Sequence, residues 1–272
     1  MQNLNGRLEN IFCSSLNVAV REQLLTSLYE QLAAAVPDIK HQYSQFKVDS
    51  TYLERKIRAV HAFQISLVCK AIELFKLNPS QSVVVDIGDS AGTHLQYLKA
   101  MFGHMRTLSI NLDPMAVERI KAKGLEAQCI RAEDLHKQSI KADIFLLYEV
   151  LEHLLNPLDF LHNLSTKTEG RILIVTVPYT SSSHVALRHI RRENKQKVYA
   201  ENTHIFELSP EDWKLVFKHC GWRPRYEQIY YQYPKKSFLR FTKMLWKKAD
   251  FEGFWGVILE RDHSWSQLYS DW

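Results

Sequence analysis

Apolar positions divide the chain into two regions with different periodicities. In residues 1–80 apolar side chains recur every three or four positions, along 16–36 and again along 52–75, which predicts helices and no strand. From residue 82 onward, short apolar runs alternate with helical patterns. These runs, each predicted as a strand, lie at 83–87, 107–111, 127–130, 144–147, 171–177, 226–231 and 256–260.

Three of the intervening helices carry the same start signal, a short polar residue followed by proline. The pairs are Asp113–Pro114, Asn156–Pro157 and Ser209–Pro210. The first residue of such a pair accepts a hydrogen bond from the first helical turn, and proline suits the first helical position. Strands that alternate with helices in this way predict a parallel sheet covered by helices on both faces.

The same pattern gives the expected domain organisation. We expect a helical N-terminal cap over residues 1–80 and one α/β domain over residues 81–272. Two stretches break the alternation and are predicted insertions, near 180–203 and near 235–250. The first holds Arg188, Arg191, Arg192, Lys195 and Lys197, and the second mixes lysine and arginine with phenylalanine, leucine, methionine and tryptophan.

Composition and charge narrow the classes of function. The chain has 272 residues and a net charge of +5, too small a charge to predict nucleic-acid binding without a concentrated basic patch. No apolar run reaches the length of a membrane span, and the first residues lack the profile of a signal peptide. Its four cysteines have no paired CxxC spacing and are expected to be reduced thiols. We therefore expect a cytoplasmic protein.

The stretch VVVDIGDSAGTH, residues 83–94, predicts a strand, a tight turn and a helix start. Glycines in such a turn let backbone N–H groups approach a ligand, and the helix N-terminus favours electron-rich groups. The turn therefore predicts a nucleotide-type cofactor site. Gly88 and Gly92 are four residues apart with Ser90 between them, whereas the dinucleotide fingerprint GxGxxG spans five.

The turn resembles motif I of class I S-adenosylmethionine-dependent methyltransferases, and later segments resemble the same family in the same order. These are SINLDP, RAEDL, YEVLEHL, TVPY and THIFELSPEDWKLVFKHCGW, which together with the turn cover about residues 82–231. The EHL sequence is similar to that of the bacterial small-molecule branch. The resemblance implies S-adenosylmethionine as cofactor and a Rossmann-like, doubly wound, mostly parallel seven-stranded sheet with the helical N-terminal cap.

The resemblance also implies positions for cofactor contacts. The methionine moiety would lie against Asp86, Gly88, Asp89, Ser90 and Gly92, the ribose against Asn111 and Leu112, and adenine against Ala132 and Glu133, while the upstream helix offers Tyr52, Lys56 and Gln64. Three positions depart from the family pattern. Ser90 replaces a glycine, and Asn111 and Arg131 replace acids, so we expect weaker cofactor binding unless Asp113 substitutes. We favour Asp113 as a helix N-cap instead.

Candidate catalytic residues follow the strand at 144–147 and lie in THIFELS. We predict His153 or His204 as the base for a hydroxyl acceptor, with Tyr148 and Glu149 beside the reacting groups. The alternative for each histidine is a structural role. Some quinone-pathway relatives with the EHL sequence use a metal, but an adjacent Glu–His pair does not by itself define a metal site. We predict no metal.

The reaction predicted is methyl transfer to a hydroxyl, or an amine, of a small-molecule or carbohydrate-type acceptor. The basic residues of 188–197 suggest an anionic acceptor such as a sugar or nucleotide sugar. The segment from Lys235 to Lys248 suggests weak peripheral contact with an anionic membrane, or else a helix packed on the sheet with a solvated basic face. The alternatives for the whole chain are a non-catalytic cofactor-binding partner protein and an NAD(P) oxidoreductase.

Overall fold

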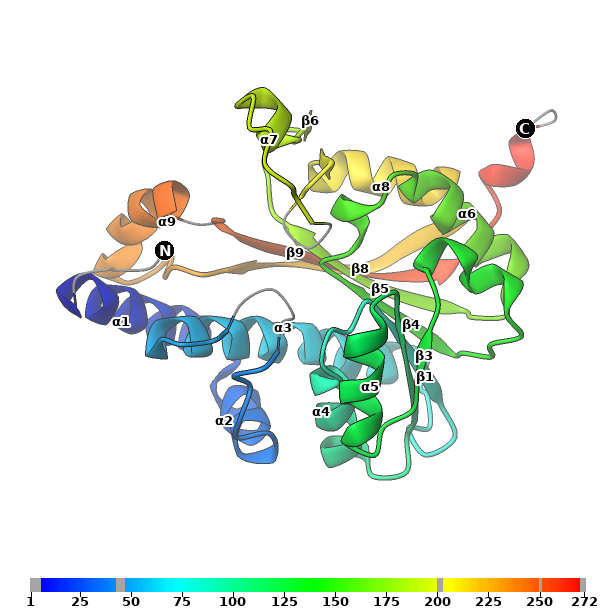
Figure 1. Ribbon diagram of the computed structural model, residues 1–272, viewed down its shortest axis with the longest axis horizontal. Coiled ribbons are helices and arrows are strands. Elements are labelled where there is room, and N and C mark those ends of the chain that lie inside the picture. Colours follow the sequence, from blue (N-terminus) through cyan, green and yellow to red (C-terminus); the bar gives the residue numbers. More distant parts are fainter. Residues whose placement is uncertain (1–5, 43–46, 200–202, 250, 270–272) are drawn as a thin grey trace.

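A seven-stranded sheet forms the centre of the computed structural model, which describes residues 6–42, 47–199, 203–249 and 251–269 (Figure 1). Parts of both predicted insertions lie outside the described residues. The strand order is β3-β2-β1-β4-β5-β9-β8. The strands are β1 (Val83–Ile87), β2 (Arg106–Asn111), β3 (Ala127–Cys129), β4 (Ile144–Tyr148), β5 (Ile172–Pro178), β8 (Trp222–Tyr231) and β9 (Gly253–Arg261).

Strand direction confirms the predicted fold class. Strands β1 to β5 pair in parallel, and β9 runs antiparallel to both of its neighbours, β5 and β8. The chain winds outward in one direction from β1 to β3 and then in the other from β4, so the order reverses between β1 and β4. Ligands of such sheets bind at the carboxyl ends of the strands beside this reversal.

Both faces of the sheet are buried along its central strands, which explains why β1, β4, β5 and β9 read as continuous apolar runs. Successive residues of one strand enter opposite cores: Val84 packs in the core that includes α3, whereas Val85 packs in the core that includes α6 and α8. The first face carries α3 (Thr51–Phe75) and α4 (Thr93–Phe102), with α5 (Pro114–Ala122) beside β2 and β3. The second face carries η1 (Ala132–Lys137), α6 (Pro157–Lys167) and α8 (Pro210–His219).

The N-terminal region is helical as predicted, with one difference. The single pattern over 16–36 forms two helices, α1 (Gly6–Glu22) and α2 (Thr26–Ala35), because Leu24 between them adopts a left-handed φ of 60°. Helix α3 begins at the N-cap Ser50, whose side chain accepts the Leu53 N–H at 3.2 Å. Its residues Phe63 and Leu67 are fully buried in the core beneath β9, so α3 is a layer of the sheet domain as well as part of the N-terminal region.

The three polar–proline signals start helices at the predicted residues. Asp113 accepts the N–H of Met115 at 2.9 Å, and the other two capping side chains likewise accept from their first turns. Each cap satisfies an N–H that the helix itself leaves unpaired. Asp113 is therefore the N-cap of α5, as we favoured.

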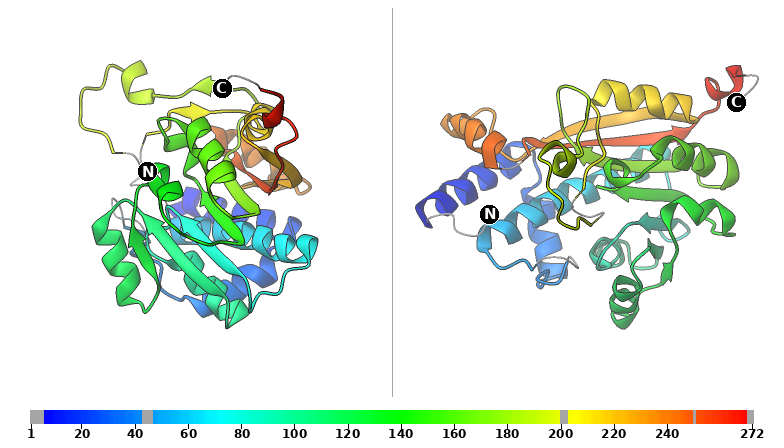
Figure 2. Two further views of the ribbon diagram at one scale, coloured as in Figure 1. Left: turned by 90° about the vertical axis from the view of Figure 1, so that its right-hand side faces the viewer. Right: turned by 45° about the horizontal axis from the view of Figure 1, so that its top comes forward.

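Both insertions contain structure of their own. The first forms a two-stranded ribbon, β6 (His184–Val185) and β7 (Phe206–Glu207), with the short helix α7 (Arg188–Arg191) between them, and it extends away from the body (Figure 2). The second forms η4 (Phe238–Thr242) and α9 (Lys243–Ala249), which lie beside α1 (Figure 1). Short turns η2 (Leu151–His153) and η5 (Ser266–Leu268) complete the described elements. Within the described ranges, none of the helices combines the length and apolarity needed to cross a bilayer.

Candidate functional site

A cavity of about 890 Å³ opens at the carboxyl ends of β1, β2 and β4, beside the reversal of strand order. This volume lies within the usual range of small-molecule sites. Nearly all of the predicted site residues line it. They are Lys56, Gln64, Asp86, Gly88, Asp89, Ser90, Asn111, Leu112, Ala132, Glu133, Tyr148, Glu149, His153 and His204.

The glycine turn forms one wall. Gly88 has a φ of +94°, and a Cβ there would lie 2.6 Å from Val150 Cγ2, so both the conformation and the space require glycine. Asp89 Oδ1 accepts the backbone N–H groups of Ala91 and Gly92, at 3.3 and 2.9 Å. Gly92 itself does not line the cavity but, at a φ of +72°, shapes the turn into α4.

Ser90, the departure from glycine, ties this turn to the N-terminal region. Its hydroxyl donates to the Gln42 carbonyl at 2.6 Å, and the Thr93 hydroxyl hydrogen-bonds to the Gln42 side chain. Gln42 also lines the cavity. The serine therefore holds the segment before α3 against the turn.

Asn111 is likewise engaged with the backbone. Its Nδ2 donates to the Asp89 carbonyl at 3.0 Å, and its Oδ1 accepts the Asp113 N–H at 2.8 Å. A carboxylate at this position retains the second bond but has no hydrogen to donate in the first. The amide therefore joins the end of β2 to the glycine turn, which an acid does not do.

The predicted adenine end of the cavity is the more exposed one. Leu112 is 58% exposed there, and the guanidinium of Arg131 lies 3.3 Å from the Glu133 carboxylate. Arg131 is the third departure from the family pattern, and its positive charge is partly compensated by the carboxylate of Glu133. Ala132, at the start of η1, lines the same end of the cavity.

A buried polar network lies beneath the cavity and centres on His94, which the sequence analysis did not single out. Its Nδ1 lies 3.0 Å from Asp86 Oδ2, and its Nε2 lies 3.1 Å from Gln64 Oε1. Both partners are acceptors, so the ring carries both protons. Burial opposes this charge, but the hydrogen bond and the charge of Asp86 outweigh it and raise the pKa of His94. His94 and Asp86 therefore form a buried ion pair beneath the cavity.

The upstream helix contributes two of its three predicted residues. Gln64 continues the network, because its Nε2 donates to Thr176 Oγ1 at 3.1 Å, and Lys56 lines the cavity. Tyr52 was predicted wrongly. Its side chain is 4% exposed, and its ring packs against Phe12 and Trp246, at centroid distances of 5.4 and 5.9 Å, away from the cavity wall.

The residues after β4 place two carboxyl groups in the cavity wall. Glu149 adopts a φ of 55°, which is unusual for a residue with a side chain and is typical of functional sites. Burial raises the pKa of Glu149 to about 8. Burial, and then the charge of Glu149, raises the pKa of Glu152 well above its usual range. Neither oxygen of Glu152 makes a hydrogen bond to any described residue. The pair therefore retains protons at neutral pH.

Tyr148 supports this wall from behind. Its hydroxyl donates to the Gln64 carbonyl at 3.0 Å, and its ring lies edge-on to His94 at 5.0 Å. Burial raises its pKa well above the usual range. The geometry favours a positioning role for Tyr148 over proton transfer.

The two predicted histidines meet across the cavity, with ring centroids 4.9 Å apart. His153 Nδ1 donates to the Thr203 carbonyl at 3.0 Å. His204 Nδ1 lies 2.8 Å from Glu207 Oε1. The hydrogen bond from His204 lowers the pKa of Glu207 to about 2, and the charge of Arg188 adds to this shift, so the carboxylate is ionised and accepts the hydrogen bond of Nδ1–H. In the neutral form of each ring, the proton lies on Nδ1 and the lone pair on Nε2.

The two imidazoles and the Glu152 carboxyl group lie close enough together to bind a metal cation. One ligand atom from each of Glu152, His153 and His204 lies within 4.8 Å of the others. Two imidazoles and a carboxylate are a common donor set for divalent transition metals, and a hydrogen bond from the other ring nitrogen is usual for such ligands. Asp86, Asp89 and His94 form a second close group, in which the histidine carries both protons and offers no lone pair.

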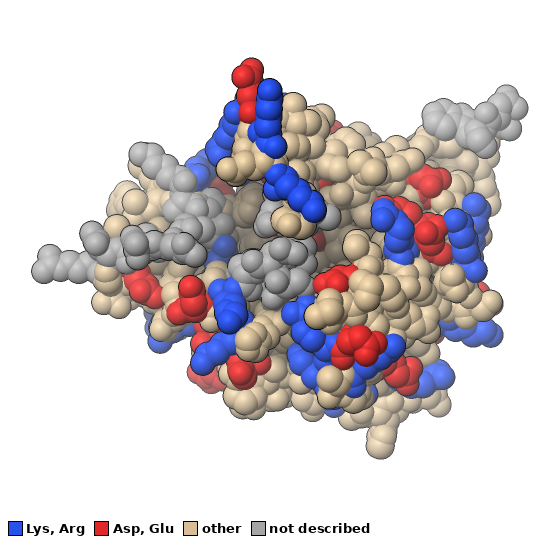
Figure 3. All heavy atoms as spheres, viewed as in Figure 1, with Lys and Arg blue, Asp and Glu red and all other residues tan. Residues whose placement is uncertain are grey.

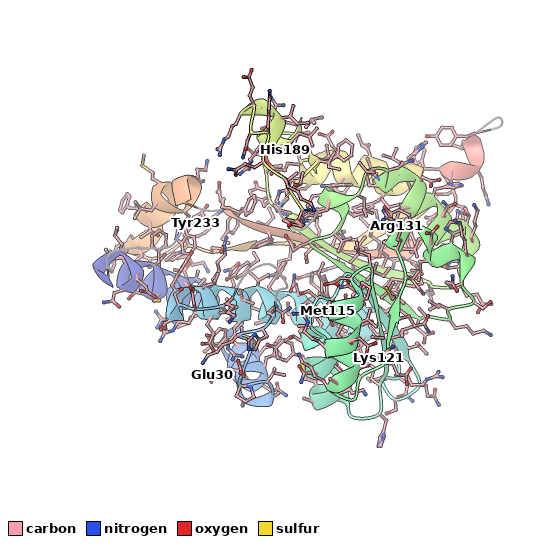
Figure 4. All side chains as sticks on the ribbon, in the orientation of Figure 1. Glu30, Met115, Lys121, Arg131, His189 and Tyr233 are labelled. Atoms are coloured by element: carbon pink, nitrogen blue, oxygen red, sulfur yellow. The ribbon has the colours of Figure 1, made fainter. Side chains whose placement is uncertain are left out.

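The basic residues of the first insertion do not line the cavity. Arg188 binds Glu207 at 3.1 Å, and Arg191 Nε donates to the Ala186 carbonyl at 2.9 Å. The helix that carries them stands away from the sheet, as the position of His189 shows (Figure 4). Lys and Arg gather on this projecting part of the surface (Figure 3). The insertion contributes Val198 and Tyr199 to the cavity instead.

Comparison with known proteins decides the family. Residues 52–227 match the model of a family described as methyltransferase domain. The chain belongs to this methyltransferase family. It is a class I S-adenosylmethionine-dependent methyltransferase, which excludes the oxidoreductase alternative, and its cofactor is S-adenosylmethionine. No protein of curated function matches the sequence.

Solved structures share the fold of this methyltransferase at low sequence identity. A candidate sarcosine dimethylglycine methyltransferase from Galdieria sulphuraria has a TM-score of 0.55 at 12% identity, over 77% of this chain and 86% of that one. Magnesium protoporphyrin IX methyltransferase from Synechocystis PCC 6803, with bound S-adenosylmethionine, has a TM-score of 0.53 at 11% identity, over 89% and 95% of the two chains.

The residues of the cavity fit this cofactor. S-adenosylmethionine carries positive charge on its sulfonium and ammonium groups, and Asp86 and Asp89 bring acidic groups to the inner wall. Asp89 Oδ2 is buried and makes no hydrogen bond to a described residue, so it remains available to a donor. Burial, and then the charge of Asp86, raises the pKa of Asp89 to about 6. A cation beside it would offset both effects.

Proposed function

We propose that this methyltransferase transfers a methyl group to a hydroxyl of a small acceptor whose body is largely apolar. The pairing of His204 with Glu207 carries the proposal. Glu207 is ionised and accepts the hydrogen bond of Nδ1–H, which leaves Nε2 of the neutral ring as the proton acceptor. The imidazolium formed when His204 takes the hydroxyl proton would be stabilised by this carboxylate.

His153 is the less favourable base. The carboxyl group nearest to its Nε2 is that of Glu152, with Oε1 at 3.9 Å. The pKa of Glu152 is raised well above its usual range, so this group remains protonated and offers little stabilisation to an imidazolium. We assign His153 a positioning role beside the acceptor.

The chemistry required of the protein is modest. S-adenosylmethionine supplies a methyl group that is already activated by its sulfonium. The acceptor oxygen must lie in line behind that carbon, and positioning of this kind lowers barriers by ~7–11 kcal/mol. A base contributes about 10²- to 10⁴-fold in rate. His204 would take the proton as the new O–CH₃ bond forms, and the S–CH₃ electrons return to sulfur.

The cavity wall near His204 supports an apolar acceptor. It is formed by aliphatic and aromatic side chains from β5, the first insertion, the turn after β4, and the start of β9 with the residues just before it. They include Leu154, Leu155, Pro178, Val198, Tyr199, Phe251 and Phe254. A carbohydrate-type or nucleotide-sugar acceptor has less support, since the arginines and lysines of 188–197 do not line the cavity. An amine acceptor also has less support, because Glu149 and Glu152 retain their protons at neutral pH and offer no negative charge to a cationic group.

Alanine replacement of His204 and of His153 tests the proposal, with release of S-adenosylhomocysteine as the assay. The panel should contain hydroxylated aromatic and aliphatic compounds with matched amines and sugars. We expect kcat to fall about 10²- to 10⁴-fold for His204→Ala and less for His153→Ala. Binding of S-adenosylmethionine, measured in parallel by thermal shift with NAD as the control ligand, should persist in both. Unchanged turnover in both variants would exclude either histidine as the base.

A further inference from the structure

The segment from residue 235 to 247, the docking segment, exposes large apolar side chains. Phe238 is 79% exposed, Phe241 is 74% exposed and Met244 is 72% exposed. They are spaced three residues apart along η4 and α9, which places them on one side of the segment. Single exposed apolar residues are ordinary, but three on one short projecting element form a patch.

The opposite side of the docking segment is held firmly. Trp246 is fully buried, packs edge-on against Phe12 at 4.8 Å and donates from Nε1 to Ser15 Oγ at 3.3 Å. The Glu22 carboxylate accepts the backbone N–H groups of Lys235, Lys236 and Ser237, at 2.7 to 3.0 Å. The segment is therefore fixed on α1, and the exposure of its apolar face does not arise from a loose attachment.

The surroundings of the patch are basic. Lys235, Lys236 and Arg240 are exposed, and the Lys235 ammonium lies over the Tyr231 ring at 3.7 Å from its centroid. Lys243 and Lys247 extend toward Glu252, at 2.9 and 3.4 Å. The segment therefore carries five cations beside two carboxylates, those of Glu22 and Glu252. Tyr233, which donates to the same Glu252, lies beside α9 (Figure 4).

We propose that the docking segment binds the surface of an anionic membrane, with Phe238, Phe241 and Met244 entering the interface between headgroups and acyl chains. Apolar side chains surrounded by lysine and arginine match both parts of such a surface. A solvated basic helix face, the alternative predicted from the sequence, leaves the three exposed apolar side chains without a role.

The position of the docking segment relates it to the cavity. The chain continues from α9 directly to Phe251 and Phe254, which line the apolar wall. Docking would thus bring this wall close to the bilayer, where an apolar acceptor is concentrated. This connection rests on the proposed function, whereas the docking itself does not.

Vesicle flotation at low salt tests the proposal. The vesicles should contain phosphatidylcholine alone or an equal mixture of phosphatidylcholine and phosphatidylglycerol. We expect the full chain to float with the anionic vesicles only, and to be released by high salt. Replacing Phe238, Phe241 and Met244 together by serine should abolish flotation. Replacing Lys235, Lys236 and Arg240 by glutamate should weaken it by at least fivefold for each charge removed, since each basic residue near the surface contributes roughly that factor.

Controls keep the outcomes distinct. Leu215→Ser and Leu268→Ser change apolar residues that are 64% and 71% exposed elsewhere, and should float like the wild type. His204→Ala should also float, so failure of the proposed function does not imitate failure of docking. Absence of flotation at low salt, equal flotation with neutral vesicles, or an unaffected triple-serine variant would overturn the proposal. Self-association that the triple-serine variant loses, measured by sedimentation without lipid, would instead assign the patch to a second copy of this chain.

Discussion

Replacement of Asn111 by aspartate restores the acid that the family pattern has at this position, and the structure predicts that it is harmful. The aspartate retains the bond from the Asp113 N–H, at 2.8 Å. It loses the donor that reaches the Asp89 carbonyl, and puts a carboxylate oxygen about where the amide nitrogen now lies, 3.0 Å from that carbonyl. Two acceptors at this distance repel each other.

The magnitude follows from the two competing effects. An acceptor left without its partner costs about 1–3 kcal/mol, and a charged acceptor gains only about 1 kcal/mol over a neutral one toward a ribose hydroxyl. We therefore expect the free energy of unfolding to fall by about 1–3 kcal/mol, and Tm by roughly 2–10 °C for a chain of this size. The Kd for S-adenosylmethionine should rise, because the turn that carries Asp89 moves away.

Calorimetry for Tm and titration of S-adenosylmethionine for Kd separate these effects. Asn194→Asp is the matched control. The Asn194 side chain is exposed and accepts the Gln196 N–H at 3.0 Å through an oxygen that aspartate retains, so Tm should not change. An Asn111→Asp variant with unchanged Tm and about fivefold tighter cofactor binding would refute the reasoning.

Further substitutions and conditions test other parts of the site. The folded chain keeps the Glu149 proton up to about pH 8, whereas an unfolded chain releases it near 4.5, so stability falls as pH rises between these values. The Glu149→Gln variant should therefore show a flatter dependence of Tm on pH, measured in EDTA. A slope equal to that of the wild type would contradict this reasoning. Ser90→Ala removes the hydrogen bond to the Gln42 carbonyl, which is worth about 0.5–1.5 kcal/mol. Dissociation of S-adenosylmethionine, measured by stopped flow, should therefore accelerate by about two- to tenfold. An unchanged rate would show that this bond does not help to close the site. Dialysis against EDTA should leave kcat unchanged if His204 is the base, whereas a loss that Mn²⁺ restores would reassign Glu152, His153 and His204 to a metal centre.

Local sequence pattern was sufficient for the sheet and its helices. The central strands β1, β4, β5 and β9 are buried on both faces, so each appears as an apolar run, and polar–proline pairs mark three helix starts. The break at Leu24 was missed because no glycine or proline marks it. The ribbon of β6 and β7 was missed because two-residue strands leave no periodicity to detect.

The site was predictable where one segment carries it and was missed where distant segments meet. His94 lies within the glycine-turn motif, yet its meaning depends on Gln64, thirty residues earlier in the chain, which α3 brings beneath the sheet. Glu207 lies only three residues after His204, but its contacts with His184 and Arg188 form only when the ribbon brings β6 and α7 beside it. Tyr52 failed for the converse reason, because α1 and α9 cover the face of α3 that a sequence pattern leaves open.

The departures from the family pattern bear on whether this methyltransferase has kept its activity. In a site that has lost its function, substitutions that remove hydrogen bonds are not compensated, and buried polar groups are left without partners. Here Ser90 and Asn111 each form a bond that the family residue cannot form, one to Gln42 and one to Asp89, and both hold the glycine turn in place. Arg131 is paired with Glu133. Departures that are each matched by a partner indicate a site rebuilt around the same cofactor, which argues against the non-catalytic alternative.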